Sequence, residues 1–151
     1  MTEFTIRGGR PEDAEVIAGF NRAMAEETEA KKLDLGISVS GVRALLERPQ
    51  NGRYLVAEQG DEIVGSLMVT TEWSDWRNGF FWWVQSVYVR PEFRRQGVYR
   101  ALYTEVRIHA KAQPDVCGIR LYVENENEGA QKTYEALGMK KTGYRLYEEE
   151  I

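Results

Sequence analysis

The stretch from Phe80 to Arg100 decides how this chain folds, and it reads Phe80-Phe81-Trp82-Trp83-Val84-Gln85-Ser86-Val87-Tyr88-Val89-Arg90-Pro91-Glu92-Phe93-Arg94-Arg95-Gln96-Gly97-Val98-Tyr99-Arg100. It is apolar through Val84, which is typical of a strand that is covered on both faces. After Pro91, apolar residues recur at helical spacing from about Val98 to Lys111. The stretch therefore predicts a strand, a basic turn and a helix in succession.

The segments on either side predict the rest of the fold. Alternating apolar residues predict five further strands, at Phe4–Arg7, Tyr54–Glu58, Ile63–Glu72, Cys117–Val123 and Tyr144–Tyr147. Helical spacing predicts three further helices, from Pro11 to about Glu27, from Ser38 or Ser40 to Pro49, and from Asn127 to Leu137 with Gly138 as a left-handed stop. The resulting order, βααβββαβαβ, is that of an α/β (α+β) protein. Its one strand–helix–strand crossover must be right-handed and parallel.

Length and composition restrict the class of protein. The 151 residues contain no repeat or linker, so we expect a single domain over residues 1–151. Twenty basic and 24 acidic residues give a net charge of −4, which argues against a general nucleic-acid-binding protein. One cysteine and one histidine leave little for a metal site. No apolar run could span a membrane and no signal peptide is evident, so we expect a cytoplasmic protein.

The turn between the central strand and its helix has the features of an anion site. Arg90, Arg94, Arg95 and Arg100 fall within eleven residues. Amides at a helix N-terminus attract negative charge, and Gly97 permits a close approach. A solvated basic face at a helix start is the alternative interpretation. The patterns G-x-x-x-x-G-K-[ST] and G-x-G-x-x-G are both absent, which argues against nucleoside-triphosphate and dinucleotide sites of those types.

Two motifs carry a resemblance to a known family. Residues 87–98 resemble the acetyl-coenzyme A motif of the GCN5-related N-acetyltransferase (GNAT) family, whose signature is [RQ]-x-x-G-x-[GA]. Residues 127–139 resemble the same family's N-x-x-A-x-x-x-Y-x-x-x-G-[FM] helix, and Ile6-Arg7…Asp13-Ala14 fits its usual start. The likeness covers essentially the whole chain, and the pair of motifs is far more specific than either alone. It implies a mixed, mostly antiparallel sheet of six to seven strands flanked by about four helices.

The resemblance also implies an N-acetyltransferase that uses acetyl-coenzyme A as cosubstrate and no metal. The backbone of Val87 and Val89 would pair with the pantetheine arm, and the amides from Arg95 to Arg100 would hold the pyrophosphate. Asn127 would bind the pantetheine, and Tyr134 would approach the thioester sulfur. Tyr99 stands where the family usually has glycine or alanine. The implied cofactor-binding residues are Val87, Tyr88, Val89, Arg94, Arg95, Gln96, Gly97, Val98, Tyr99, Arg100, Asn127, Ala130 and Tyr134.

Acetyl transfer to an amine needs a group that takes the amine's proton. A lysine-like amine has a pKa of about 10.4, so neutralising it at pH 7 costs roughly 4–5 kcal/mol. A carboxylate must take the proton, directly or through water. We predict Glu124 for this role beside Tyr134 as the second catalytic residue, because it ends a strand next to the expected cofactor channel; a solvated strand end is the alternative. The other candidates are Glu27, Glu29, Glu72 and Asp75.

The acceptor site is expected to combine the acidic end of the first helix with the tryptophan-rich segment before the motif. The residues we predict for it are Glu27, Glu29, Trp73, Asp75 and Gln85. They would suit a cationic, partly apolar primary amine such as a polyamine, through charge and cation–π contacts. A protein lysine or N-terminus fits as well. We expect no nucleic-acid or membrane partner, and the last predicted strand would suit a homodimer.

Three functions remain open on this reasoning. The first is acetyl transfer from acetyl-coenzyme A to a primary amine by direct attack in a ternary complex. The second is a non-catalytic acyl-coenzyme A sensor on the same fold, because the strand that leads into the motif, Trp82 to Gln85, carries no carboxylate. The third is a phosphate- or nucleotide-binding module unrelated to acyl transfer.

Overall fold

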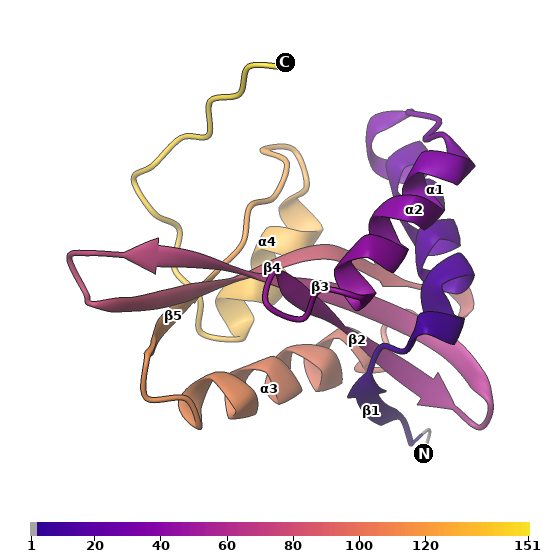
Figure 1. The fold of residues 1–151 in the computed structure, drawn as a ribbon, viewed down its shortest axis with the longest axis horizontal. Coiled ribbons are helices and arrows are strands. Elements are labelled where there is room, and N and C mark those ends of the chain that lie inside the picture. The colour runs from indigo at the N-terminus through magenta and orange to yellow at the C-terminus, as the bar shows by residue number, and fades with distance from the viewer. Residues whose placement is uncertain (1–2) are drawn as a thin grey trace. The chain divides into compact units, whose positions relative to one another are not determined.

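The computed structural model describes residues 3–151, which form two compact units, residues 3–121 and 122–151. The first unit contains the sheet and three α-helices (Figure 1). Its strands are β1 (Thr5–Gly8), β2 (Gly52–Gln59), β3 (Glu62–Ser74), β4 (Gly79–Val89) and β5 (Val116–Arg120). Its helices are α1 (Ala14–Glu29), α2 (Leu35–Leu46) and α3 (Val98–Lys111), with short 3₁₀ turns at Pro11–Asp13 and Pro91–Phe93. The second unit contains α4 (Glu128–Ala136).

The five strands form one mixed sheet in the order β1-β2-β3-β4-β5. The pairs from β1 to β4 are antiparallel, and β4 pairs with β5 in parallel through the α3 crossover. The predicted mixed, mostly antiparallel class is therefore confirmed. The predicted number of six to seven strands is not, because the described chain contains five. None of the described helices is long and apolar enough to cross a membrane.

Two predicted strands differ from the structure. Residues 144–147, predicted as the last strand, form no strand in the described chain, and Tyr144 and Tyr147 are 74% and 90% exposed. Alternating apolar residues form a strand only when a neighbouring strand pairs with them. The strand predicted at Cys117–Val123 ends earlier, at Arg120, where its pairing with β4 also ends.

The helix boundaries follow their capping residues. Helix α3 has the predicted limits, Val98 and Lys111. The prediction for α2 was wrong at its start, because the helix begins at Leu35 rather than at Ser38 or Ser40. Asp34 caps it, with its carboxylate accepting a hydrogen bond from the Ile37 amide at 2.8 Å, so the first turn forms before the serines. Gly138 follows α4 with a φ of 96°, as expected for a left-handed stop.

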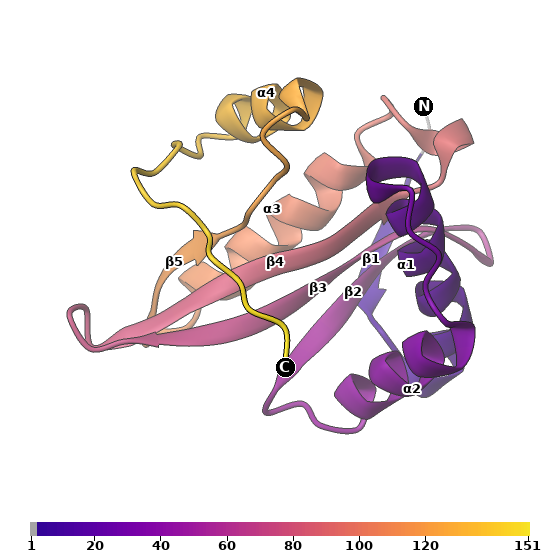
Figure 2. The ribbon, with the colours of Figure 1, turned by 90° about the horizontal axis from the view of Figure 1, so that it is seen from above.

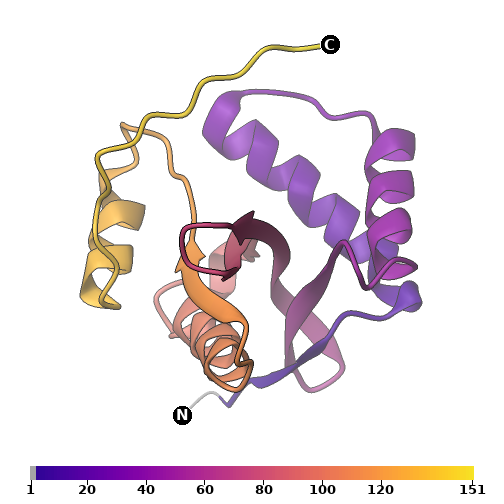
Figure 3. The same ribbon diagram turned by 60° about the vertical axis from the view of Figure 1, so that its left-hand side comes forward.

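The first unit has three layers. Helices α1 and α2 cover one face of the sheet and α3 covers the other (Figures 2 and 3). Strand β2 is buried on both faces because its residues alternate between two cores. Leu55 and Ala57 belong to the core under α3, whereas Tyr54 and Val56 belong to the core under α1 and α2.

A partly buried ion pair joins β1 to the start of α1. The Arg7 guanidinium donates to the Asp13 carboxylate at 2.8 Å and to Glu58 at 2.6 Å. The Arg10 amide also donates to Asp13, at 2.7 Å. Burial opposes the ionisation of Asp13, but the Arg7 guanidinium and the Arg10 amide outweigh it and hold the pKa of Asp13 below its usual value. Asp13 is therefore a carboxylate that stabilises the fold while it is charged.

Replacing Asp13 with asparagine is expected to lower the free energy of unfolding by about 2 kcal/mol, because the partly buried Arg7 guanidinium loses one of its two charged partners. The pKa of Asp13 is lowered in the folded state, so its contribution is present above the unfolded value of about 4 and is lost as the pH falls below it. Urea unfolding between neutral and acidic pH measures both effects. If the Asp13→Asn variant lost stability on acidification as steeply as the wild type, Asp13 would not be the source of that dependence.

Candidate active site

The second half of β4 has an open edge. Within the described part of the chain, the ladder between β4 and β5 ends at Trp83 and Arg120. On the other side, the Arg90 amide donates to the Val64 carbonyl of β3 at 2.9 Å. Because neighbouring residues in a strand direct their peptide groups to opposite sides, those of Val89 point away from β3. The backbone of β4 can therefore pair with an extended ligand along this edge.

A β-bulge bends β4 at the start of this edge. Two residues, Ser86 and Val87, lie opposite the single residue Leu67 of β3, and Ser86 has a φ of 51°. A bulge of this kind increases the local twist of the strand and changes where its side chains point. Val84, before the bulge, and Val87, within it, both pack on the core under α3. Tyr88 packs on the opposite face against Phe20 of α1, with ring centroids 5.1 Å apart.

The turn that follows β4 presents backbone amides at the start of α3. Arg95 and Gly97 have positive φ values of 63° and 85°, and Gly97 is the N-cap of the helix. A side chain at Gly97 would meet no atom within 4 Å, so this face of the turn is open. The first amides of an α-helix have no acceptor inside the helix, and they attract anions. The side chain of Tyr99 packs against the core under α3, so the larger residue at this position is accommodated inside the protein.

Arg94 ties the turn to α1. Its Nε donates to the Val89 carbonyl at 2.8 Å, and its Nη2 donates to Glu27 Oε2, also at 2.8 Å. The Tyr88 hydroxyl donates to Glu27 Oε1 at 3.3 Å. Burial, together with the neighbouring charge of Glu27, raises the pKa of Tyr88, so this phenol keeps its proton. The structure thus brings Glu27 together with two residues of the predicted cofactor site.

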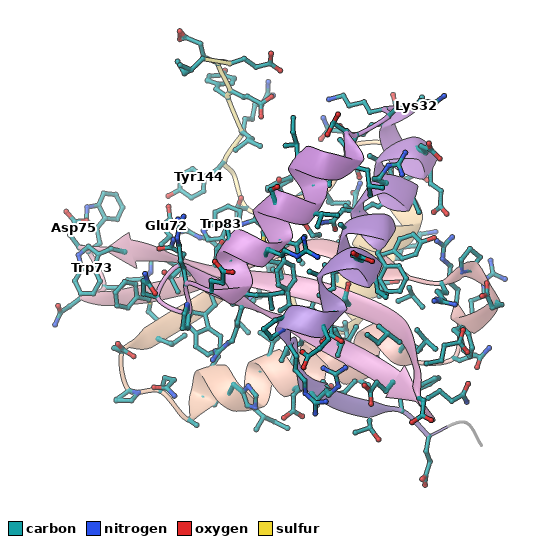
Figure 4. All side chains as sticks on the ribbon, turned by 45° about the vertical axis from the view of Figure 1, so that its right-hand side comes forward. Lys32, Glu72, Trp73, Asp75, Trp83 and Tyr144 are labelled. Atoms are coloured by element: carbon teal, nitrogen blue, oxygen red, sulfur yellow. The ribbon has the colours of Figure 1, made fainter. Side chains whose placement is uncertain are left out.

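A second polar cluster lies where β4 and β5 separate. Glu72 of β3 accepts a hydrogen bond from Trp83 Nε1 at 3.1 Å. It also forms an ion pair with Arg120, whose Nη1 donates to it at 2.8 Å. The Arg120 guanidinium also stacks on the ring of Phe81, 3.6 Å from its centroid. Gln85, the next residue of β4 on the same face as Trp83, donates to Thr70 Oγ1 at 2.6 Å. Figure 4 shows Glu72 and Trp83 side by side on the sheet.

The predicted acceptor residues do not form one group. Trp73 is 52% exposed and packs edge-on against Phe80, and Asp75 lies in the turn beyond it, at the end of the β3–β4 hairpin (Figure 4). Glu27 contacts Tyr88, near the other end of β4. Tyr88 lies eight residues after Phe80 along the strand, which corresponds to roughly 26 Å. Glu29 is exposed and lies 3.7 Å from Lys31. The length of β4 therefore keeps these two groups apart.

Trp83 and Arg120 are not among the residues predicted from the sequence, and Glu72 is there only one of several possible bases. The signal that could have found them is the alternation of side chains within β4, which puts Trp83 on the same face as Gln85. Their approach to Glu72 depends on the register of three strands, which spacing along the chain does not reveal.

The second unit carries the remaining predicted residues. The Asn127 side chain caps α4, with its Oδ1 accepting a hydrogen bond from the Ala130 amide at 3.1 Å. Gln131 Nε2 donates to the Glu124 carbonyl at 3.2 Å, which ties the loop to the helix. Burial, followed by the negative charge of Glu124, raises the pKa of Tyr134. Tyr134 therefore carries its proton at neutral pH.

Among residues 3–151, no three histidine, cysteine, aspartate or glutamate side chains come close enough to hold a metal ion. The single cysteine, Cys117, is exposed and free.

Comparison with known proteins agrees with this geometry. Residues 18–139 match the model of the acetyltransferase (GNAT) family. A possible acetyltransferase from Clostridium difficile 630 shares 44% identity and a TM-score of 0.91, over 98% of this chain and 97% of that chain. No curated protein matches the sequence.

Two more distant structures share the fold. One is a predicted acetyltransferase with acetyl-CoA from Clostridium acetobutylicum, at 15% identity and a TM-score of 0.80, over 97% of this chain and 96% of that chain. The other is a ribosomal-protein-alanine N-acetyltransferase from Brucella melitensis biovar Abortus 2308, at 17% identity and a TM-score of 0.78, over 99% of each chain. On the family match and the relative at 44% identity, this chain belongs to the acetyltransferase (GNAT) family.

Proposed function

We propose that this protein transfers an acetyl group from acetyl-coenzyme A to a primary amine, by direct attack in a ternary complex. The observation that carries the proposal is the open edge of β4, which leads directly into a turn of exposed amides and arginines. An extended arm that ends in a diphosphate matches that combination. Membership of the acetyltransferase family supports the same cosubstrate.

The residues present fit acetyl-coenzyme A. The peptide groups of Val87 and Val89 suit the amides of a pantetheine arm, and the amides from Arg95 to Arg100 suit a diphosphate. The open face at Gly97 leaves room for a close approach. Acetyl-coenzyme A supplies a thioester, whose carbonyl carbon an amine can attack. In this proposal Asn127 and Ala130, at the start of α4, also bind acetyl-coenzyme A.

The reaction needs two proton transfers, one to the leaving thiolate and one from the acceptor ammonium, and we assign both to side chains of this protein. We assign the proton for the leaving thiolate to the hydroxyl of Tyr134, whose raised pKa keeps it protonated. The proton of the acceptor ammonium needs a carboxylate, and Glu124 and Glu72 are the candidates from the two units. The acceptor is a primary amine, either a small amine such as a polyamine or an amine of a protein.

Thiol release from acetyl-coenzyme A, measured across a panel of amines, tests the proposal. The panel includes spermidine and a lysine-containing peptide, and amine-dependent release with at least one amine is the expected result. Binding of coenzyme A without amine-dependent release at any pH would favour an acyl-coenzyme A sensor instead. Calorimetry with coenzyme A, ATP and NAD is the companion measurement. Binding of ATP or NAD more tightly than coenzyme A would contradict the proposal.

Replacing Glu27 with glutamine is expected to tighten coenzyme A binding by a factor of about two to five, because Arg94 no longer needs to leave an ion pair. The effect is small since both side chains are about two-fifths exposed, at 43% and 41%. It should shrink at high ionic strength, which screens the pair. Calorimetry at low and high salt measures it. Glu15→Gln, which removes the exposed pair with Arg43, is the control and should leave binding unchanged; weaker binding by Glu27→Gln would contradict the expectation.

A further inference from the structure

Glu72 is held in a fixed position, and one of its two carboxylate oxygens accepts no hydrogen bond from the described residues. Both of its close partners, Trp83 Nε1 and Arg120 Nη1, donate to the same atom, Oε1. The other oxygen, Oε2, accepts no hydrogen bond from residues 3–151. The side chain of Glu72 is 45% exposed, so Oε2 can reach a group outside the protein. The cluster therefore presents an oriented, accessible carboxylate oxygen.

The position of Glu72 relative to the open edge follows from the sheet register. Trp83 and Arg120 are the last paired residues of β4 and β5, and the open edge begins at the next residue, Val84. Glu72 and Thr70 lie two residues apart on β3, and Trp83 and Gln85 lie two residues apart on β4, so each pair shares a face of its strand. Glu72 thus borders the place where the two strands separate.

The other carboxylates of the first unit are less suited to receive a proton there. Both oxygens of Glu27 are already engaged, one by Arg94 and one by Tyr88. Glu29, the exposed last residue of α1, is paired with Lys31 just beyond the helix. Asp75 lies in the hairpin turn, further from the open edge than Glu72. Glu72 is the carboxylate that combines an open oxygen, fixed orientation and proximity to the edge.

We propose that Glu72 binds the ammonium group of the acceptor through Oε2 and takes its proton. This inference rests on the proposed function. One N–H bond of the ammonium breaks and its proton moves to Oε2, which leaves a neutral amine. The amine nitrogen then forms a bond to the thioester carbonyl carbon, the C–S bond breaks, and the electron pair leaves with sulfur. The second nitrogen proton passes to water as the amide forms. The thiolate takes a proton from Tyr134, and the resulting phenolate takes one back from water.

The pH dependence of Glu72→Gln tests this assignment. Below about pH 10, the neutral fraction of a lysine-like amine rises tenfold with each pH unit. If Glu72 takes the proton, kcat/KM of the wild type for spermidine stays nearly level from about pH 7 to about pH 9. The variant must capture amine that is already neutral, so its kcat/KM starts at least tenfold lower and rises by about tenfold per pH unit.

Glu62→Gln is the matched control. Glu62 lies on the same strand, is about half exposed, and pairs with an arginine, Arg90, at 2.6 Å. Its variant should follow the wild-type profile. Equal affinity of all three proteins for coenzyme A, measured by calorimetry, shows that the turn at Arg94 is intact. If spermidine is not acetylated, the amine of the panel with the highest kcat/KM replaces it.

The possible outcomes distinguish failure of the role of Glu72 from failure of the proposed acetyl transfer. A Glu72→Gln profile that runs parallel to the wild type, at any level, overturns the role of Glu72 and leaves Glu124 as the candidate base. A wild type whose own kcat/KM rises tenfold per pH unit overturns it too, since no group would then be capturing the ammonium. A wild type that releases no thiol with any amine overturns the proposed function, and this inference with it.

Discussion

Replacing Tyr134 with phenylalanine is expected to lower kcat by about two to three orders of magnitude and to leave the Kd for coenzyme A within about twofold. The hydroxyl is expected to act where negative charge develops on sulfur, and loss of one such donor typically has this effect. A thiol has a pKa near 8.5 and a tyrosine near 10, so full proton transfer is uphill by about 2 kcal/mol. Burial and the charge of Glu124 raise the pKa of Tyr134 further, so hydrogen bonding to the sulfur provides most of the effect.

Steady-state thiol release and calorimetry with coenzyme A together measure this prediction. The control is Tyr147→Phe, which removes a hydroxyl from a side chain that is 90% exposed in the same unit. That variant should match the wild type in both measurements. An unchanged kcat for Tyr134→Phe, or a loss of coenzyme A affinity in step with the loss of kcat, would rule out the proposed role.

Replacing Gly97 with valine is expected to weaken coenzyme A binding by up to roughly a hundredfold, because a β-branched residue is strained by about 1–3 kcal/mol at this backbone conformation. Gly97 has a φ of 85° and no atom lies within 4 Å of where a Cβ would stand. The strain is therefore in the backbone rather than in a clash. The turn can relieve it by changing φ, and the amides that precede α3 then no longer converge on one point.

Gly60→Val separates loss of the site from loss of stability. Gly60 lies in the β2–β3 turn with a φ of 62°, and it also has no atom within 4 Å of a built Cβ. Both variants should therefore lose a similar amount of stability in urea unfolding, about 1–3 kcal/mol. Calorimetry with coenzyme A should show a large loss for Gly97→Val and none for Gly60→Val. Equal affinities in the two variants would mean that the turn at Gly97 does not bind the diphosphate.

Patterns confined to neighbouring residues predicted much of this fold. The limits of α3 follow from the turn at Gly97 and from an apolar stripe that repeats at helical spacing. The hairpin turn at Gly60 and the stop at Gly138 follow from glycine's tolerance of positive φ. The start of α2 was missed because two serines looked like the cap, whereas the Asp34 carboxylate reaches the Ile37 amide one turn earlier.

The features that could not be predicted from the sequence depend on the register between strands. Residues 144–147 have the alternation of a strand, but in the described chain no ladder includes them. The predicted acceptor residues Glu27 and Trp73 lie toward opposite ends of β4, because an extended strand of eleven residues is long compared with any side chain. Glu72, Trp83 and Arg120 come from three strands, and they meet through pairing between residues that are far apart along the chain.

The sequence by itself therefore determined the order of elements, the family resemblance, and the glycine-containing basic turn between β4 and α3. Each of these depends on residues within about one helix or hairpin of one another, where backbone preferences and side-chain spacing decide the outcome. The tertiary structure alone decided where β4 and β5 separate and which carboxylate borders that opening. Those features depend on the register of the sheet and on the bulge at Ser86, which follow from packing across the whole unit.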